Sequence, residues 1–301
     1  MHRTLPAADP NRPAAPPTPG AVLPAGAARR QRARRLGGRR QRTFLQIGAP
    51  IPPLAWTGLA VLSFLLPFAA WAALAASGAV SQVFLPLPGD VVSAGRRLVT
   101  SGELAADTWA SVRRIGLGFA ISLAISVPLG LAMGAFRAVN ALFEPVIGFL
   151  RYLPATAFVP LLLIWQGIGE EPKVTLIVLG TVFFNILMVA NTVWQVPTEL
   201  IKMARTLGAG NYRIFRHIIV PHTLPGVIDT ARVNLAAAWN LIVVAELLAA
   251  DEGLGRRISV AGKFLRVDEI FAVLAVIGVI GLCTDLGLRV LRNRIAPWSQ
   301  E

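Results

Sequence analysis

Cysteine and histidine are scarce in this chain, which has one cysteine, Cys283, and three histidines among its 301 residues. A single cysteine cannot form a disulfide within the chain, and no cysteine cluster is present to hold a metal. His217 and His222 are five residues apart across a proline, which is not the spacing of two metal ligands on one helix face. We therefore expect no disulfide framework, no metal site and no cofactor.

Charge is also scarce, since charged residues make up 15% of the chain and hydrophobic residues 54%. Soluble domains contain about 25% charged residues. No charged side chain occurs between Arg42 and Asp90. These long uncharged runs indicate a polytopic helical membrane protein. The sequence has no phosphate-binding P-loop pattern and no catalytic constellation, so the chain itself is not expected to be an enzyme.

The basic charge is concentrated at the start of the chain, where residues 1–44 hold ten arginines and a single acid, Asp9. This segment is rich in Pro, Ala and Gly and has few side chains that could form a core, so we expect it to be disordered. Its arginines would lie along an anionic cytoplasmic membrane surface and help to set the topology. A twin-arginine export signal is not favoured, because Arg39-Arg40 lie three residues from Phe44-Leu45 and the span that follows is too long for a cleaved signal. A nucleic-acid-binding tail is not favoured either, because no aromatic or folded module accompanies the arginines.

Residues 45–301 are expected to form one all-α membrane domain with six transmembrane helices. The third span is predicted to be irregular, because it contains Pro145, Pro154, Pro160 and an embedded arginine, Arg151. Cys283 falls in the sixth span and is expected to be a packing residue. The predicted spans cover about 54–78, 115–136, 141–164, 174–195, 226–249 and 269–290.

The longest polar interruption of this apolar domain is the stretch 196–225, which is predicted to fold as two short helices. Thr198 is expected to cap the first helix and Asn211 the second, because both residue types are good N-caps. Gly208 and Gly210 supply the turn between them. Pro221 is expected to end the second helix. The stretch is basic and has apolar anchors, as expected of a docking element at a membrane surface.

This stretch resembles the cytoplasmic loop of the inner-membrane permeases of binding-protein-dependent ABC importers. Their pattern is Glu-Ala-Ala, three residues, Gly, nine residues, Ile, one residue, then Leu-Pro. Ala204, Gly208, Ile218 and Pro221 match it at the right spacing, whereas Lys202 and Met203 replace the usual Glu and Ala, and Val220 replaces Leu. The runs 165–170 and 253–255 are similar to those of the taurine, nitrate and sulfonate subfamily.

The resemblance implies a type I ABC importer permease fold in a bacterial inner membrane. Two permease chains, most simply a homodimer, would form the pore, and ATP would be hydrolysed by separate cytoplasmic subunits. A periplasmic or lipid-anchored solute-binding protein would deliver a small, anionic solute such as a sulfonate, taurine or nitrate. The ATPase-docking loop would contain Lys202, Met203, Ala204, Arg205, Gly208, Ile218 and Pro221.

Orientation follows from the basic tail and from the docking-loop resemblance, which together place both termini in the cytoplasm. The Lys and Arg count alone supports this only when the tail is included, because the remaining segments carry nearly equal numbers on the two sides. Besides lipid and the protein partners above, no nucleic-acid partner is expected.

Ionisable and polar side chains inside the spans are candidates for the translocation pathway, because charge in hydrocarbon is costly. The candidates are Arg151, Tyr152, Trp239, Asn240 and Glu246. The planar fork of Arg151 suits a sulfonate, nitrate or carboxylate, although Arg151 could instead reach the interface or pair with Glu144 or Glu246. Glu246 could likewise form a structural salt bridge. The pairs Asp229/Arg232 and Asp285/Arg289 are expected to neutralise each other within their helices.

Two other classes of function remain open at this point. An ATP-independent channel or carrier would line a pore within one chain and would not need the docking loop. A membrane anchor with a nucleic-acid-binding tail would account only for residues 1–44. The sequence shows no internal repeat, so an inverted-repeat secondary transporter has no support. The solute cannot be chosen from the sequence among sulfonates, taurine, nitrate and similar molecules.

Overall fold

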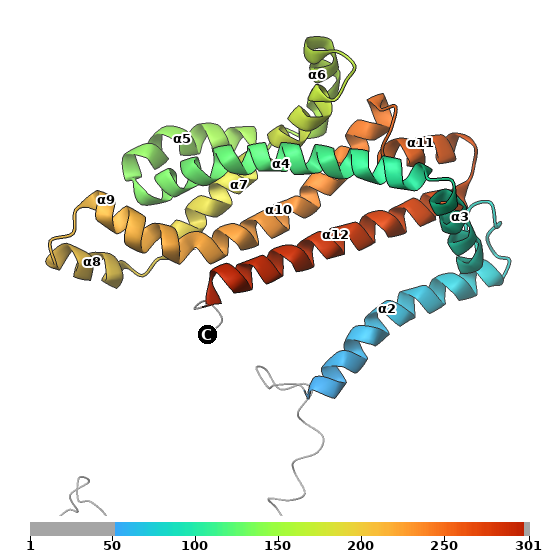
Figure 1. Cartoon of the computed structure of the whole chain (residues 1–301), viewed down its shortest axis with the longest axis horizontal. Helices are drawn as coiled ribbons and strands as arrows, with labels where there is room; N and C mark the ends of the chain where they lie inside the picture. Colours follow the sequence, from blue (N-terminus) through green and yellow to red (C-terminus); the bar gives the residue numbers. More distant parts are fainter. Residues whose placement is uncertain (1–51, 298–301) are drawn as a thin grey trace, which may run out of the picture. The chain divides into compact units, whose positions relative to one another are not determined.

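A computed structural model describes residues 52–297 of the chain (Figure 1). The predicted tail, residues 1–44, lies outside this part. The chain divides into two units, residues 1–69 and 70–301, which are described separately. The described part of the first unit is the beginning of α2, Pro53–Ala76, an uncharged and largely apolar helix with Pro67 inside it. Its bounds agree with the predicted first span to within two residues.

The larger unit is built of helices, and the described residues contain no β-strand. In chain order the elements after α2 are α3 Pro88–Thr100, α4 Glu103–Ala135, α5 Arg137–Leu150, the 3₁₀ turn η1 Ala155–Phe158, α6 Val159–Gln166, α7 Glu171–Trp194, α8 Thr198–Thr206, α9 Asn211–Ile214, the π-helical turn η2 Phe215–Ile219, α10 Val220–Ala249, α11 Leu254–Lys263 and α12 Val267–Ile295.

The all-α, six-span prediction is confirmed. Five helices of the described part are long and apolar enough to cross a membrane, and α5 with η1 and α6 forms a sixth span that is bent by 76°. The break follows Leu150 and precedes Pro154, as the proline content predicted. The second span is longer than predicted: α4 begins at Glu103 rather than near residue 115, because the amphipathic connector continues into the same helix.

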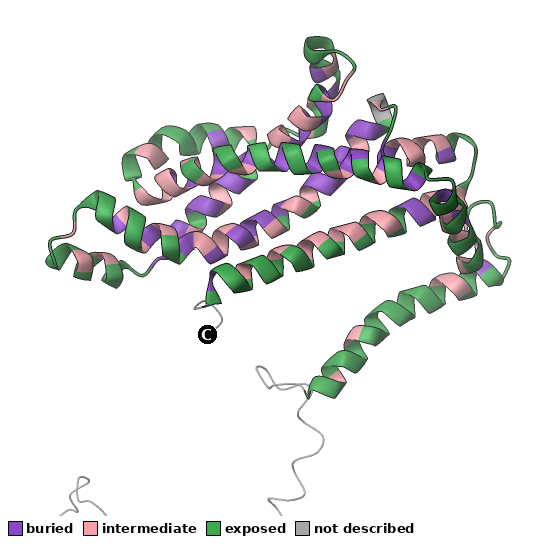
Figure 2. Cartoon of the chain, viewed as in Figure 1, coloured by how far each residue is buried: buried purple, intermediate pink, exposed green. Residues whose placement is uncertain are grey.

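The core of the larger unit lies where α4, α7 and α10 run side by side, and these helices carry most of its buried residues (Figure 2). The face of α4 toward α7 has a small residue at every fourth position. At Gly130, an added Cβ would lie 2.6 Å from the carbonyl oxygen of Ile186, so only glycine permits this approach. Small residues at this spacing are a common device for close helix packing in membranes. The series is Gly118, Ser122, Ser126, Gly130 and Gly134.

A chain of buried polar side chains ties these three helices together. Thr181 on α7 donates to Ser122 Oγ on α4 over 2.8 Å, and Asn185 Nδ2 donates to the same oxygen over 3.1 Å. Asn234 Nδ2 on α10 donates to Asn185 Oδ1 over 2.7 Å. All four side chains are buried. Because their hydrogen bonds are made inside the bundle, these groups fix the rotation of each helix without facing lipid.

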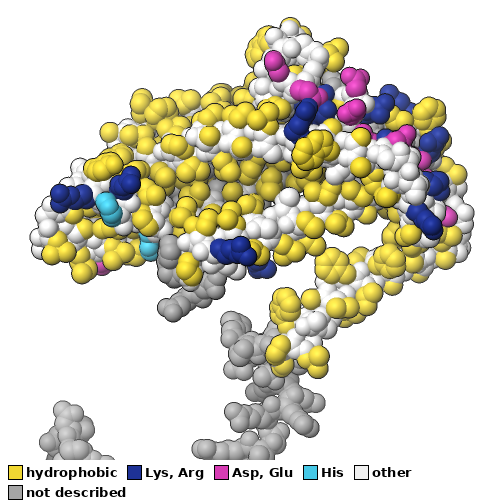
Figure 3. Space-filling view, in the orientation of Figure 1, with side chains coloured by type: hydrophobic (Ala, Val, Ile, Leu, Met, Phe, Trp, Pro, Cys, Tyr) yellow, Lys and Arg dark blue, Asp and Glu magenta, His cyan; other side chains and the backbone are white. Residues whose placement is uncertain are grey.

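Charged side chains gather toward the two ends of this unit, and apolar side chains cover the band between them (Figure 3). One end carries α8 and α9 and is called the docking-loop end below. The opposite end carries α3, α11 and the turn before α7, and is called the α11 end. This distribution is that of a bundle whose middle contacts hydrocarbon and whose ends contact water.

Candidate functional site

The turn between α8 and α9 forms a Schellman motif at the C-terminus of α8. Ala209 N–H donates to Ala204 O and Gly208 N–H donates to Arg205 O, each over 2.9 Å. Gly208 has φ +78°, the left-handed conformation that this motif needs and that glycine adopts without a Cβ penalty. The predicted turn is therefore present, and the motif glycine is the residue that makes it.

The predicted caps are wrong. The N-cap positions of α8 and α9 are Pro197 and Gly210, and neither helix has a side-chain cap. Thr198 lies one residue inside α8, and its hydroxyl contacts Glu199 Oε1 instead of a backbone N–H. Asn211 likewise lies at the first position inside α9.

Pro221 does not end the second docking helix, contrary to the prediction. The helix that begins at Asn211 passes through the π-helical turn η2 directly into α10, and the whole of 211–247 is continuous enough to count as one span. Pro221 is the second residue of α10. In the π-turn, backbone hydrogen bonds join residues five apart instead of four. The hydrogen-bond register of the helix therefore changes just before Pro221, which has no N–H to donate. The docking loop is thus joined rigidly to a membrane span.

The docking-loop residues divide into anchors and exposed groups. Ala204 and Ile218 pack against a buried cluster that contains Val193, Ile214 and Ile219, which holds the loop on the ends of α7 and α10. Lys202, Met203, Arg205, Gly208 and Pro221 are exposed. Large apolar side chains also stand in the open at this end, with Met203 64%, Leu207 86% and Tyr212 71% exposed. Such a patch at an aqueous end of the bundle indicates a surface for a protein partner.

Three of the five pathway candidates line one cavity. Arg151 and Tyr152, at the break of the third span, share a cavity of about 370 Å³ with Asn240 of α10. Arg151 Nη2 lies 3.1 Å from Tyr152 Oη, and the guanidinium lies over the tyrosine ring, 4.9 Å from its centroid. No carboxylate in the described part of the chain pairs with Arg151. The cavity therefore presents a cation without a resident counter-ion.

Glu246 lies elsewhere, buried at the α11 end. Arg114 Nη1 donates to its Oε1 over 2.6 Å, Ser111 Oγ lies 2.8 Å from both oxygens, and Gly255 N–H donates to Oε2 over 2.9 Å. Neither carboxylate oxygen is exposed or left without a donor. The arrangement is the structural ion pair that the sequence left open, but the partner is Arg114 and not Arg151.

Arg114 joins four segments of the α11 end. Besides Glu246, its guanidinium donates to both oxygens of Glu170, over 2.6 and 2.7 Å, and to the carbonyl oxygen of Glu252 over 2.7 Å. Hydrogen bonds from the Arg114 guanidinium, and to a smaller extent from the Lys173 ammonium group, lower the pKa of Glu170, in the turn before α7, to about 2. Two turns before Arg114 on α4, Asp107 accepts from Gly253 N–H and from Arg257. We call Asp107, Ser111, Arg114, Glu170 and Glu246 the α11-end clamp.

The two expected intrahelical pairs are in part wrong. Arg232 does contact Asp229, at 3.1 Å, but it also binds both oxygens of Asp285 on α12, at 3.0 and 2.9 Å. Arg292 Nε lies 3.0 Å from Asp229 Oδ2. Asp285 is thus the partner of Arg232 across the two helices. Arg232 on α10 and Asp285 on α12 lie at the same level along two neighbouring helices. The spacing of residues along one helix cannot predict such a contact between two helices.

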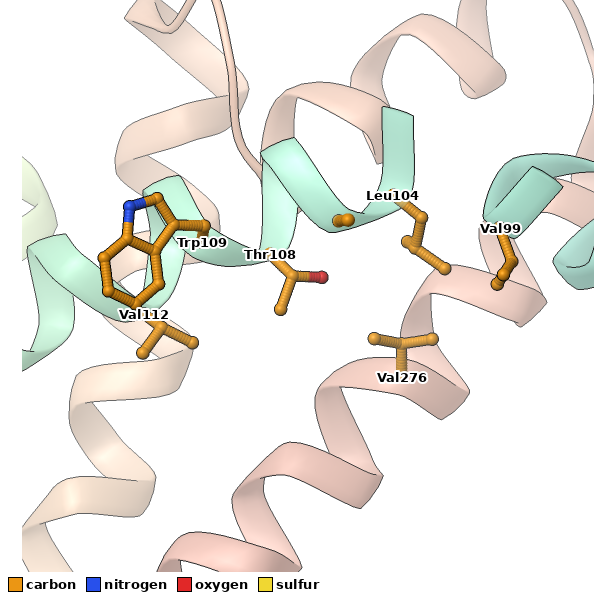
Figure 4. Close-up of a pocket in the computed structure, with 7 residues that line it drawn as sticks. Val99, Leu104, Thr108, Trp109, Val112 and Val276 are labelled. Carbon is orange, nitrogen blue, oxygen red and sulfur yellow. The ribbon is translucent and has the colours of Figure 1, made fainter. Parts of the chain in front are cut away.

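Two further cavities lack the features of an anion site. A cavity of about 410 Å³ at the α11 end is lined by Val99, Leu104, Ala105, Thr108, Trp109, Val112 and Val276, with the Thr108 hydroxyl as its single polar side-chain group apart from the indole of Trp109 (Figure 4). Trp239 is buried and lines a second cavity together with Arg232 and Asp285, to which Asn240 also contributes. That arginine is already neutralised by its carboxylates.

The family "Binding-protein-dependent transport system inner membrane component" matches residues 126–297. The chain belongs to this family of permeases. The taurine transport system permease protein TauC of Escherichia coli strain K12 is 36% identical to the permease, over 77% of this chain and 86% of TauC. The putative aliphatic sulfonates transport permease protein SsuC of Bacillus subtilis strain 168 is 31% identical, over 77% of this chain and 84% of SsuC.

The fold of the permease is also that of solved importer subunits. An inward-facing structure of the MetNI methionine ABC transporter matches with a TM-score of 0.56 at 19% identity, covering 67% of this chain and 98% of that one. The type I ABC importer permease fold expected from the resemblance is thus confirmed, and the permease is a multi-pass membrane subunit and not an enzyme.

Sequence reasoning missed most of the α11-end clamp. It marked Glu246 but not Asp107, Ser111 and Arg114, which stand four and three residues apart on one face of α4. That helical spacing of polar residues, next to the start of an apolar run, was the available signal. The buried polar chain from Ser122 to Asn234 gave no comparable signal, because its members are single neutral residues on three different helices.

Proposed function

We propose that the permease works as a homodimer in an ATP-driven importer of the bacterial inner membrane, with both termini in the cytoplasm. Cytoplasmic ATP-binding subunits would bind the docking-loop end, and a periplasmic or lipid-anchored solute-binding protein would bind the α11 end. The solute would be a small anion, since the relatives TauC and SsuC are named for taurine and aliphatic sulfonates, both of which carry a sulfonate group.

The docking-loop end is the observation that carries this proposal. Its apolar side chains Met203, Leu207 and Tyr212 are exposed at an end of the bundle, and the exposed cations Lys202 and Arg205 are on the same helix as Met203. A partner that covers this surface would contact a helix that continues into α10 without a break. Movement of the partner on ATP binding would then be passed directly to a span that lines the Arg151 cavity.

The exposed face of α10 supports a second copy of the chain. Val233 and Asn240 lie on this face, two helical turns apart. Asn240 Nδ2 donates only to the Ala236 carbonyl, one turn back. An amide in the middle of a span is costly against lipid, so this face would meet protein or a water-filled pathway. Two chains that face each other across Arg151, Tyr152 and Asn240 would enclose such a pathway.

Co-purification tests the proposal against an ATP-independent channel or carrier. We expect the full-length permease, extracted in mild detergent from its native host, to bring down an ATPase subunit in equal amount. Substitution of Met203 and Leu207 by Asp should release that subunit, because charge would replace the exposed apolar contacts. The matched control is Trp109→Asp, an equally exposed apolar residue at the opposite end. Solute flux without any ATPase would instead support the channel or carrier.

Arg151→Gln is expected to reduce ATP-driven uptake the most among substitutions at the cavity, with assembly and basal ATPase activity retained. Arg151→Lys should transport at an intermediate rate, because it keeps the charge but loses the planar fork. Uptake of labelled solute into proteoliposomes measures both variants. If Arg151→Gln instead prevents assembly and a second change at Glu144 restores it, Arg151 is half of a structural pair and the pathway role is wrong.

A further inference from the structure

We propose that the Arg151 cavity selects anions that carry a hydrocarbon body, such as an alkanesulfonate, over bare inorganic anions such as nitrate. The inference rests on the proposed function and adds a substrate class to it. The cavity is formed by three segments: the break between α5 and η1, the middle of α7, and α10. Its volume of about 370 Å³ is in the range of sites for small organic molecules.

Four polar side chains line the cavity, those of Arg151, Tyr152, Thr156 and Asn240. Arg151 and Tyr152 are adjacent in the chain and in contact, and Asn240 supplies an amide from α10. The two carboxylates that the sequence offered as partners are engaged elsewhere, since Glu144 accepts from Asn140 and Glu246 from Arg114. A sulfonate or carboxylate would therefore find a guanidinium fork with no carboxylate partner, in contact with the Tyr152 phenol, and an amide in the same cavity lining.

Apart from the Thr156 hydroxyl, the rest of the lining is apolar. Phe183 and Phe184 on α7 and Leu153 after the break face the same space, with Leu150, Leu179 and Leu241 around them. A bare anion at Arg151 would lose water on this side and gain no polar contact in return. An alkyl chain would gain about fourfold in affinity for each methylene that it buries against these side chains. The lining thus favours an amphipathic anion.

Depth distinguishes a solute from a membrane lipid, which is also an amphipathic anion. Arg151 follows the 14 residues of α5, which rise about 20 Å from the docking-loop end. Gly180 and Phe183, which line the cavity, lie near the middle of the 24-residue helix α7. Both helices place the cavity near the centre of a hydrocarbon layer of about 30 Å, beyond the reach of a lipid headgroup.

Competition binding tests the inference on the full-length permease in lipid nanodiscs. Radiolabelled 1-hexanesulfonate is displaced by unlabelled 1-hexanesulfonate, methanesulfonate or nitrate. From the methylene factor above, we expect inhibition constants to rise at least about tenfold from hexanesulfonate to methanesulfonate, and about fourfold more to nitrate, which lacks the methyl group. Hexyltrimethylammonium has the same body and the opposite charge and should not compete. Competition by this cation at hexanesulfonate concentrations would mean partition into the apolar surface, and would overturn the inference.

Variants separate the apolar lining from the charge. Phe184→Ala should weaken hexanesulfonate binding about tenfold and change methanesulfonate less than twofold, whereas Phe149→Ala, an exposed residue outside the lining, should change neither. Arg151→Gln should abolish the binding of both hexanesulfonate and methanesulfonate. Equal constants for nitrate and hexanesulfonate that both depend on Arg151 would overturn the hydrocarbon selectivity and leave the proposed anion importer standing. Binding that does not depend on Arg151 would overturn the anion pathway as well.

Discussion

Arg114→Ala is expected to destabilise the folded permease by about 3–5 kcal/mol, the range observed when one partner of a buried ion pair is removed. The Arg114 side chain is 4% exposed and the Glu246 side chain 0%. Without Arg114, Glu246 keeps Ser111 and the Gly255 N–H as donors but loses its counter-charge. The Glu252 carbonyl loses its donor too.

The preceding residue in the chain provides a matched control. Arg113 also contacts Glu170, at 3.3 Å, but its side chain is 61% exposed. Exposed pairs contribute about 0–1 kcal/mol, so Arg113→Ala should leave the free energy of unfolding nearly unchanged. Unfolding by SDS titration in mixed micelles measures both variants. The charge argument also requires that Arg114→Ala with Glu246→Gln be more stable than Arg114→Ala alone. An Arg114→Ala variant as stable as Arg113→Ala would contradict the role of the clamp.

The features that the sequence predicted depend on residues close together in the chain. Span positions follow from apolar runs of about 20 residues, and the break in the third span follows from Pro154, which restricts the residue before it. The docking-loop turn follows from Gly208, whose left-handed backbone is a local requirement. In each case the physical cause lies within about one helical turn or one apolar run.

The features that the sequence did not predict depend on how helices rotate against one another. Asp285 pairs with Arg232, which is 53 residues away, because α10 and α12 turn these faces together. Glu246 meets Arg114 across 132 residues for the same reason. Pro221 failed as a helix terminator because the π-turn before it changed the hydrogen-bond register. Contact between side chains of separate helices is fixed by packing, such as the small residues along α4, and packing is not visible in one helix.

Gly208→Val is expected to lower ATP-driven uptake about tenfold or more while the permease remains in the membrane. Gly208 has φ +78°, and a Cβ built there would meet no atom within 4 Å. The penalty is therefore conformational and not steric crowding by neighbours: the left-handed region costs an ordinary residue about 1–2 kcal/mol and a β-branched residue more. The Schellman bonds from Gly208 and Ala209 would be lost as the turn relaxes. The exposed side chains Met203 and Leu207 would then point away from the positions that a partner subunit needs.

A series at two glycines isolates this cause. Gly208→Asn should retain more uptake than Gly208→Val, because Asn enters the left-handed region more readily. Gly210→Val is the control: Gly210 has φ −74° and ψ 165°, a conformation open to any residue, and its Cβ also meets nothing. Solute uptake and ATPase activity are measured on the same proteoliposomes. We expect Gly208→Val to hydrolyse ATP without uptake if the subunits still bind, or to lose the ATPase on purification if they do not. Equal uptake by the Gly208→Val and Gly210→Val variants would show that the turn at Gly208 does not couple the loop to transport.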